Sequence, residues 1–67
     1  MLFTFVIHLE EGEQKGLVKN YDFNIQAESY AKKLLSDNPK TKKVEIFQYV
    51  DGTFNLVDNV YNVEKEE

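Results

Sequence analysis

The sequence lacks several of the residues on which small proteins often depend. It has no cysteine, no tryptophan and no arginine, and among its 67 residues are one histidine, one proline and three glycines. Without cysteine there is neither a disulfide nor a thiolate metal site, and a zinc site built around His8 alone would have to rest on carboxylates. A domain of this length buries only about 60% of its unfolded surface. We therefore expect good packing, or association with a further chain, to supply the stabilisation that disulfides or metals give other small domains.

Long hydrophobic runs and excess positive charge are also missing. No stretch approaches the roughly 18 apolar residues of a membrane span, and the opening MLFTFVIHLEE lacks the basic start and cleavage site of a signal peptide. The net charge of −4 argues against a general binder of nucleic acid or anionic membranes. These features favour a cytoplasmic protein that does not bind membranes. The many lysine, asparagine, tyrosine and phenylalanine residues have AT-rich codons, which suggests a bacterial or phage source.

What is present is a clear change of period along the chain. Alternating apolar residues predict strands over 2–9 and 16–24, joined by the polar loop EEGEQKG. Apolar residues three and one apart predict a helix over about 26–37, capped by Asn24 or a neighbour and ended by Pro39. Further strands are predicted over about 43–50 and 53–60, around a turn at Asp51-Gly52.

This order of elements predicts an α+β fold of the ββαββ type. One helix would pack on one face of a four-stranded, mainly antiparallel sheet, in a single domain over 1–63 with a frayed, charged tail over 64–67. The layout resembles the β-grasp-like immunoglobulin-binding domains of proteins G and L, in which two hairpins flank a single helix. The resemblance covers only the order of elements, and it implies a fold but no function.

The second hairpin, VEIFQYVDGTFNLV, has large apolar residues on both faces, and the turn decides which of them face the helix. A two-residue turn at Asp51-Gly52 would pair Tyr49 with Phe54 and would set Glu45 opposite Asp58, which is an unfavourable like-charge pair. A three-residue loop would pair Ile46 with Leu56 and would turn Phe54 and Leu56 toward the helix. We favour the three-residue loop because it avoids the like-charge pair.

That choice defines both the expected core and the expected open face. The core would contain Phe3, Phe5, Ile7, Leu17, Tyr21, Phe23, Ala27, Ala31, Leu34, Leu35, Val44, Ile46, Phe54 and Leu56. The open face would show five apolar residues, which are Phe47, Tyr49, Val57, Val6 and Tyr61. Exposed aromatic residues are favoured interface anchors, so these five are candidates for an interface with another protein or with a second copy. The alternatives are that these residues pack against the C-terminal tail, that they simply line a mildly apolar open face, or that they form a small-ligand site.

Charged residues gather in two kinds of cluster. Five lysines lie around the end of the predicted helix: Lys32, Lys33, Lys40, Lys42 and Lys43. They complement the helix dipole, and in the alternative interpretation they contact the phosphates of a nucleic acid. Acidic residues gather in the first loop and in the tail, as solvated charge or as a mimic of DNA.

No catalytic, metal-binding or cofactor-binding motif is recognisable. His8 shares one face of a predicted strand with Thr4 and Val6. The serines Ser29 and Ser36 have no histidine predicted near them. The three glycines serve turns and form no phosphate-binding loop. The sequence therefore favours a non-enzymatic interaction module without cofactors, acting as a homodimer or as an inhibitor or adaptor of another protein. A nucleic-acid-associated accessory protein is the alternative.

Overall fold

The computed structural model describes residues 1–62. Its elements are β1 (Leu2–Leu9), β2 (Gln14–Asn20), α1 (Asn24–Asp37), β3 (Thr41–Val50) and β4 (Thr53–Tyr61). The strands form one sheet in the order β2-β1-β3-β4, and every neighbouring pair is antiparallel. The predicted α+β class and the ββαββ order are confirmed. In this sheet β3 lies beside β1. The expected tail over 64–67 lies outside the described residues.

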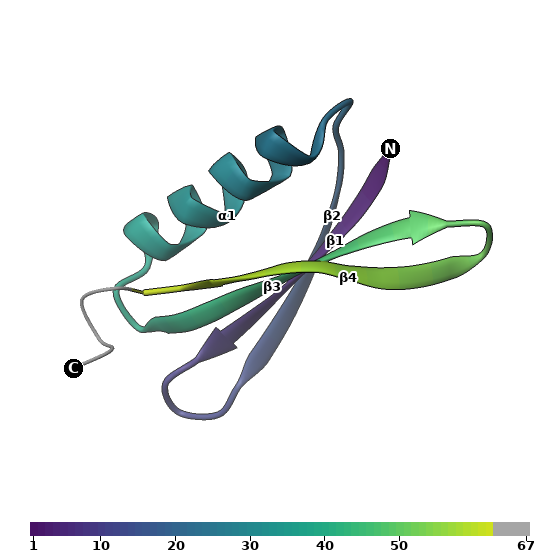
Figure 1. Ribbon diagram of the computed structural model, residues 1–67. Coiled ribbons are helices and arrows are strands. Elements are labelled where there is room, and N and C mark those ends of the chain that lie inside the picture. The colour runs from purple at the N-terminus through teal and green to yellow at the C-terminus, as the bar shows by residue number, and fades with distance from the viewer. Residues whose placement is uncertain (63–67) are drawn as a thin grey trace.

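The core lies between α1 and one face of the sheet. Figure 1 shows α1 lying along this face, while no other described element covers the opposite face. Alternate residues of β1 and β3 meet the buried alanines of α1, as their periods of two and of about 3.6 require. The fully or almost fully buried hydrophobic residues are Phe3, Phe5, Ile7, Ala27, Ala31, Leu35, Val44 and Ile46. Eight of the residues expected in the core are therefore confirmed.

The boundary between β2 and α1 differs from the prediction. The strand was expected to run over 16–24, but it ends at Asn20 and the helix begins at Asn24. Gln26, in the first turn, folds back so that its Oε1 accepts hydrogen bonds from the backbone N–H groups of Asp22 and Phe23, each at 3.0 Å. The N-cap position is Phe23, the neighbour of Asn24, and no side chain at that position caps the helix. Phe23 precedes the helix with its side chain 65% exposed, so its expected core position is wrong.

The turn between β3 and β4 has two residues, so the favoured three-residue loop is wrong. Asp51 and Gly52 both have positive φ angles, 50° and 81°, which is the backbone of a type I′ turn. Tyr49 pairs with Phe54, and Phe47 pairs with Leu56. Phe54 and Leu56 of β4 therefore lie on the open face, where they are 50% and 52% exposed. Their expected places in the core are wrong.

A bulge in β4 removes the like-charge pair that argued against this turn. The register shifts between Ile46 and Phe47, so that Asn59 rather than Asp58 lies opposite Glu45. The same shift sets Val60 opposite Val44, and Val60 packs against the core. An extra residue in one strand changes the face of everything beyond it. The bulge therefore keeps Asp58 away from Glu45 and places Val60 against the core. A regular hairpin with this turn could do neither.

The remaining expected core residues lie at the margin of the core. Leu17, Tyr21 and Leu34 are partly buried and pack against it. Thr41, which the pattern did not indicate, is fully buried where the β1–β3 register shifts next to Leu9. The core is thus smaller than the sequence suggested, and the open face is more apolar.

Candidate functional site: the open face of the sheet

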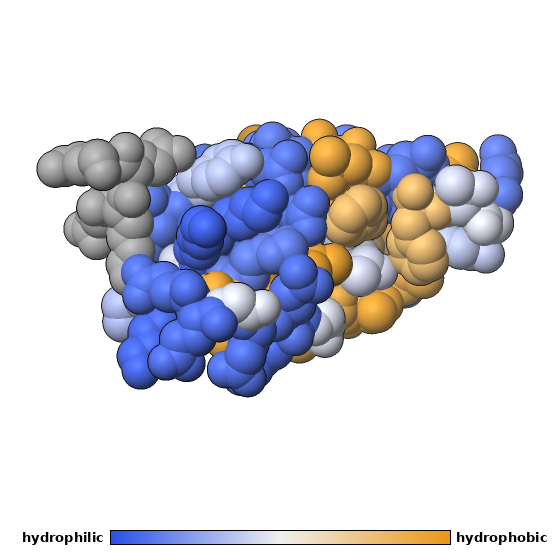
Figure 2. Space-filling model, turned by 90° about the horizontal axis from the view of Figure 1, so that it is seen from below, coloured by the Kyte–Doolittle hydropathy of each residue, from blue (hydrophilic) through white to orange (hydrophobic). Residues whose placement is uncertain are grey.

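The candidate site is one half of the sheet face that α1 leaves uncovered. The strand registers align Leu56, Phe47, Thr4 and Val18 in a row across all four strands. The pair Tyr49 and Phe54 extends the patch toward the β3–β4 turn. We call these six residues, on four strands, the apolar half. Figure 2 views this face and shows hydrophobic residues gathered on one side of it and hydrophilic residues on the other.

The apolar half is uncharged and well exposed. The rings of Tyr49 and Phe54 pack with their centroids 4.9 Å apart and their planes inclined by 58°. Tyr49 is 43% and Val18 is 59% exposed, while Phe47 is half-buried between its neighbours. Since the rings support each other at the surface, they form a preorganised apolar contact surface that loses little side-chain entropy on binding.

The other half of the open face is polar, and we call it the polar half. Its two rows across the sheet are Gly16, Val6, Glu45 and Asn59, and Gln14, His8, Lys43 and Tyr61. Nε2 of His8 contacts Oε1 of Glu45 across β1 and β3. The Nζ of Lys43 lies 5.8 Å from the centroid of the Tyr61 ring, within the range of a cation–π contact.

The structure separates the five predicted interface residues. Phe47 and Tyr49 lie in the apolar half, whereas Val6 and Tyr61 lie in the polar half. Val57, at the β4 bulge, packs against the core instead of facing outward. The residues that the sequence reasoning missed are Phe54, Leu56 and Val18. The alternation of β4 contained the signal for the first two, but it was read in the wrong register.

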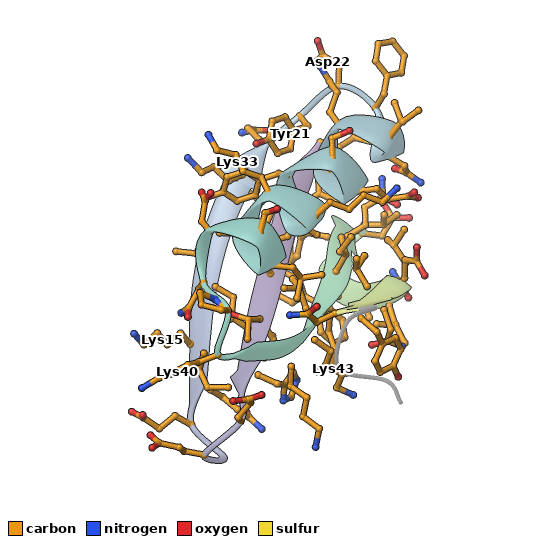
Figure 3. All side chains as sticks on the ribbon, turned by 90° about the vertical axis from the view of Figure 1, so that its left-hand side faces the viewer. Lys15, Tyr21, Asp22, Lys33, Lys40 and Lys43 are labelled. Atoms are coloured by element: carbon orange, nitrogen blue, oxygen red, sulfur yellow. The ribbon has the colours of Figure 1, made fainter. Side chains whose placement is uncertain are left out.

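The five lysines of the predicted phosphate-contacting cluster do not lie on one surface. Lys32 and Lys33 line two different hollows, one beside Tyr61 and the other beside Tyr21. Lys43 belongs to the open face, where it contacts Tyr61. In Figure 3, Lys33 and Lys40 lie on one side of the molecule and Lys43 lies away from them. Nucleic-acid binding by this cluster stays a prediction.

The described residues offer little for catalysis or metal binding. No three His, Asp or Glu side chains within residues 1–62 gather closely enough to hold a metal ion. Ser29 borders the hollow beside Tyr21 and Ser36 the one beside Tyr61, and neither hollow is lined by a histidine or a carboxylate. The helix of the described chain is too short and too polar to cross a membrane. The apolar half is therefore the feature from which a function can be argued.

Comparisons of the chain with protein-family models, with curated proteins and with solved structures gave no match.

Proposed function

We propose that this protein is a non-enzymatic interaction module that docks a protein partner on the apolar half of its open face. The observation that supports the proposal is the uncharged row Leu56–Phe47–Thr4–Val18, extended by Tyr49 and Phe54. The partner is either another protein, for which this chain acts as an inhibitor or adaptor, or a second copy of the chain.

The size of the exposed rings supports a binding role. An aromatic side chain contributes about 200 Å² when it passes from full exposure to burial. With Tyr49 43% and Phe54 50% exposed, the two rings alone offer on the order of 200 Å² of surface. Leu56 and Val18, both more than half exposed, enlarge the patch toward the few hundred Å² that often mark functional surfaces of monomers.

The distribution of charge further restricts the partner. The six residues of the apolar half carry no charge, so a partner gains contact there by apolar burial and not by ion pairs. The flanking polar half presents Lys43, Glu45 and His8 at the edge of the patch. An apolar centre with a polar margin is the usual arrangement of protein interfaces.

The test compares two double variants that remove similar apolar surface from different places. Tyr49→Ser/Leu56→Ser alters the apolar half, and Phe23→Ser/Ile25→Ser alters exposed residues at the start of α1, which are 65% and 70% exposed. Affinity capture from the source cells, with mass spectrometry, identifies the partner, and calorimetry with the purified partner measures binding. We expect Tyr49→Ser/Leu56→Ser to weaken binding at least about a hundredfold, because central anchors cost about 2 kcal/mol or more each.

The control variant should bind like the native protein. If a second copy is the partner, sedimentation velocity should show a dimer for the native chain and for Phe23→Ser/Ile25→Ser, and a monomer for the other variant. Equal binding by both double variants would show that the apolar half is not the interface.

A further inference from the structure

A second surface, separate from the open face, lies along the outer edge of β2. Within residues 1–62, β2 has β1 as its only neighbour in the sheet, so one side of its backbone is unpaired. An exposed strand edge is a template for the addition of a further strand. At Gly16 the edge has no side chain, and the space that a Cβ would take on the open face is free of other atoms within 4 Å.

The hydrogen bonds next to β2 show which of its backbone groups point outward. Met1 and Tyr21 exchange two bonds, from N of Met1 to O of Tyr21 at 2.7 Å and from N of Tyr21 to O of Met1 at 2.9 Å. In antiparallel strands, hydrogen-bonded and non-hydrogen-bonded pairs alternate. Continued along the β1–β2 register, the alternation directs the N–H and C=O groups of Lys15, Leu17 and Lys19 toward β1. The groups of Gly16 and Val18 therefore point away from the sheet.

The side chains along this edge carry a charge pattern. Lys15, Leu17 and Lys19 lie on the α1 side of β2, opposite Ile7, Phe5 and Phe3. Both lysines are exposed, whereas Leu17 is half-buried against the core. The Nζ of Lys19 lies 5.2 Å from the centroid of the Tyr30 ring, which holds this charge beside α1.

Two further lysines raise the positive potential of the same flank. Figure 3 shows Lys15, Lys33 and Lys40 on one side of the molecule, and Lys33 lies near Tyr21. Lys33 and Tyr21 line one hollow together with Tyr30. Four of the eight lysines, two of them on β2, thus lie on one side of a chain whose net charge is −4. Glu13 adds one carboxylate at the loop end of the strand, two residues before Lys15.

We propose that the edge of β2 binds an extended acidic segment of a partner protein as a fifth, antiparallel strand. The outward groups of Gly16 and Val18 form the backbone hydrogen bonds. Carboxylates of the segment lie opposite Lys15 and Lys19, and an apolar side chain between them packs on Leu17. The recognised pattern is acid, any residue, apolar, any residue, acid.

A peptide fits this surface better than a nucleic acid does. The outward backbone groups match the spacing of a strand, which a sugar–phosphate chain does not reproduce. The two tyrosines near this edge already contact the core: Tyr30 packs edge-on against Phe5 with ring centroids 5.1 Å apart, and the Tyr21 ring centroid lies 6.4 Å from that of Phe3. These contacts hold one side of each ring against the core, which limits the ring surface on which bases could stack.

The probe is a blocked heptapeptide, Thr-Glu-Thr-Leu-Thr-Glu-Thr, added to the full chain and followed by nuclear magnetic resonance. We expect shift changes confined to β2 and the facing side of α1. Binding should slow hydrogen exchange of the outward amides of Gly16 and Val18 and leave that of Leu17 unchanged, because Leu17 already bonds to β1. N-methylation of the two peptide residues facing Gly16 and Val18 should abolish binding.

Charge variants test the lysine pair. Lys15→Glu/Lys19→Glu should weaken binding at least about tenfold, since two attractive pairs become repulsive. Lys32→Glu/Lys43→Glu makes the same change in net charge on other surfaces and should bind within about twofold of the native chain. The N-methylated peptide keeps the test valid if a protein variant fails to fold.

Three results would overturn the proposal. The first is no binding of the heptapeptide at low salt, and the second is equal binding of the N-methylated peptide. The third is tighter binding of a single-stranded oligonucleotide at the same lysines. That result would show that these lysines bind the phosphates of a nucleic acid instead of an acidic peptide.

Discussion

Both faces of the sheet carry large apolar residues, yet only one face is a core. On the α1 side, Phe3, Phe5 and Ile46 are fully buried. On the open side, Phe54 and Leu56 lie on the same sheet and are half exposed. The difference is the presence of a covering element and not the chemistry of the strands. An apolar row on a strand therefore predicts burial only if the chain has another element to lay over it.

Truncating one phenylalanine on each face tests most directly whether the two faces differ in their contribution to stability. Phe5→Ala should lower the free energy of unfolding by about 3–5 kcal/mol, because it opens a cavity under Tyr30 in the buried core. Phe54→Ala should cost about 1 kcal/mol or less, since its ring is 50% exposed and loses mainly its contact with Tyr49. Urea unfolding followed by circular dichroism measures both values.

Similar losses for the two variants would mean that the open face is covered in solution. A concentration-dependent cost for Phe54→Ala would identify that cover as a second copy of the chain.

The turn that assigns Phe54 and Leu56 to the open face is the next point to test. Gly52→Ala should destabilise the protein by roughly 1–2 kcal/mol, because Gly52 has a φ of 81°, in the left-handed region. Gly16→Ala is the matched control, since Gly16 has no positive φ and open space around its Cβ. It should be neutral or slightly stabilising. Thermal unfolding of both variants gives the comparison, and an equal cost would argue against the type I′ turn.

The smallest expected effect concerns the start of the helix that covers the buried face. Gln26→Ala removes the acceptor of two backbone N–H groups and should cost about 0.5–1 kcal/mol. Gln14→Ala on the exposed edge of β2 is the control and should change stability by less than about 0.5 kcal/mol. Amide exchange at Asp22 and Phe23 should accelerate only in Gln26→Ala. Unchanged exchange there would show that the side chain of Gln26 does not cap the helix.

Much of the fold could be predicted because it depends on local periodicity. The alternation of Phe3, Phe5 and Ile7 defines β1, and the spacing of Ala27, Ala31 and Leu35 defines the buried stripe of α1. The prediction of the β2–α1 boundary failed because Phe23 continues the strand pattern, while Gln26 reaches back from the first turn to the N–H of Phe23 as in a capping box. The candidate site was predicted in part: Phe47 and Tyr49 were placed correctly on the open face, and Val57 was not.

By itself, the sequence determined the order of elements, the buried faces of β1 and α1, and the position of the β3–β4 turn, since each follows from residues close together in the chain. Only the tertiary structure decided that Phe54 and Leu56 join Phe47 and Val18 in one exposed row, and that β2 is left as an edge. Register depends on the sum of long-range contacts, and a single bulge in β4 reverses the face of the residues beyond it. The bulge forms here because it gives Glu45 a neutral neighbour and returns Val60 to the core, a choice that can be made only after β3 and β4 are paired and packed.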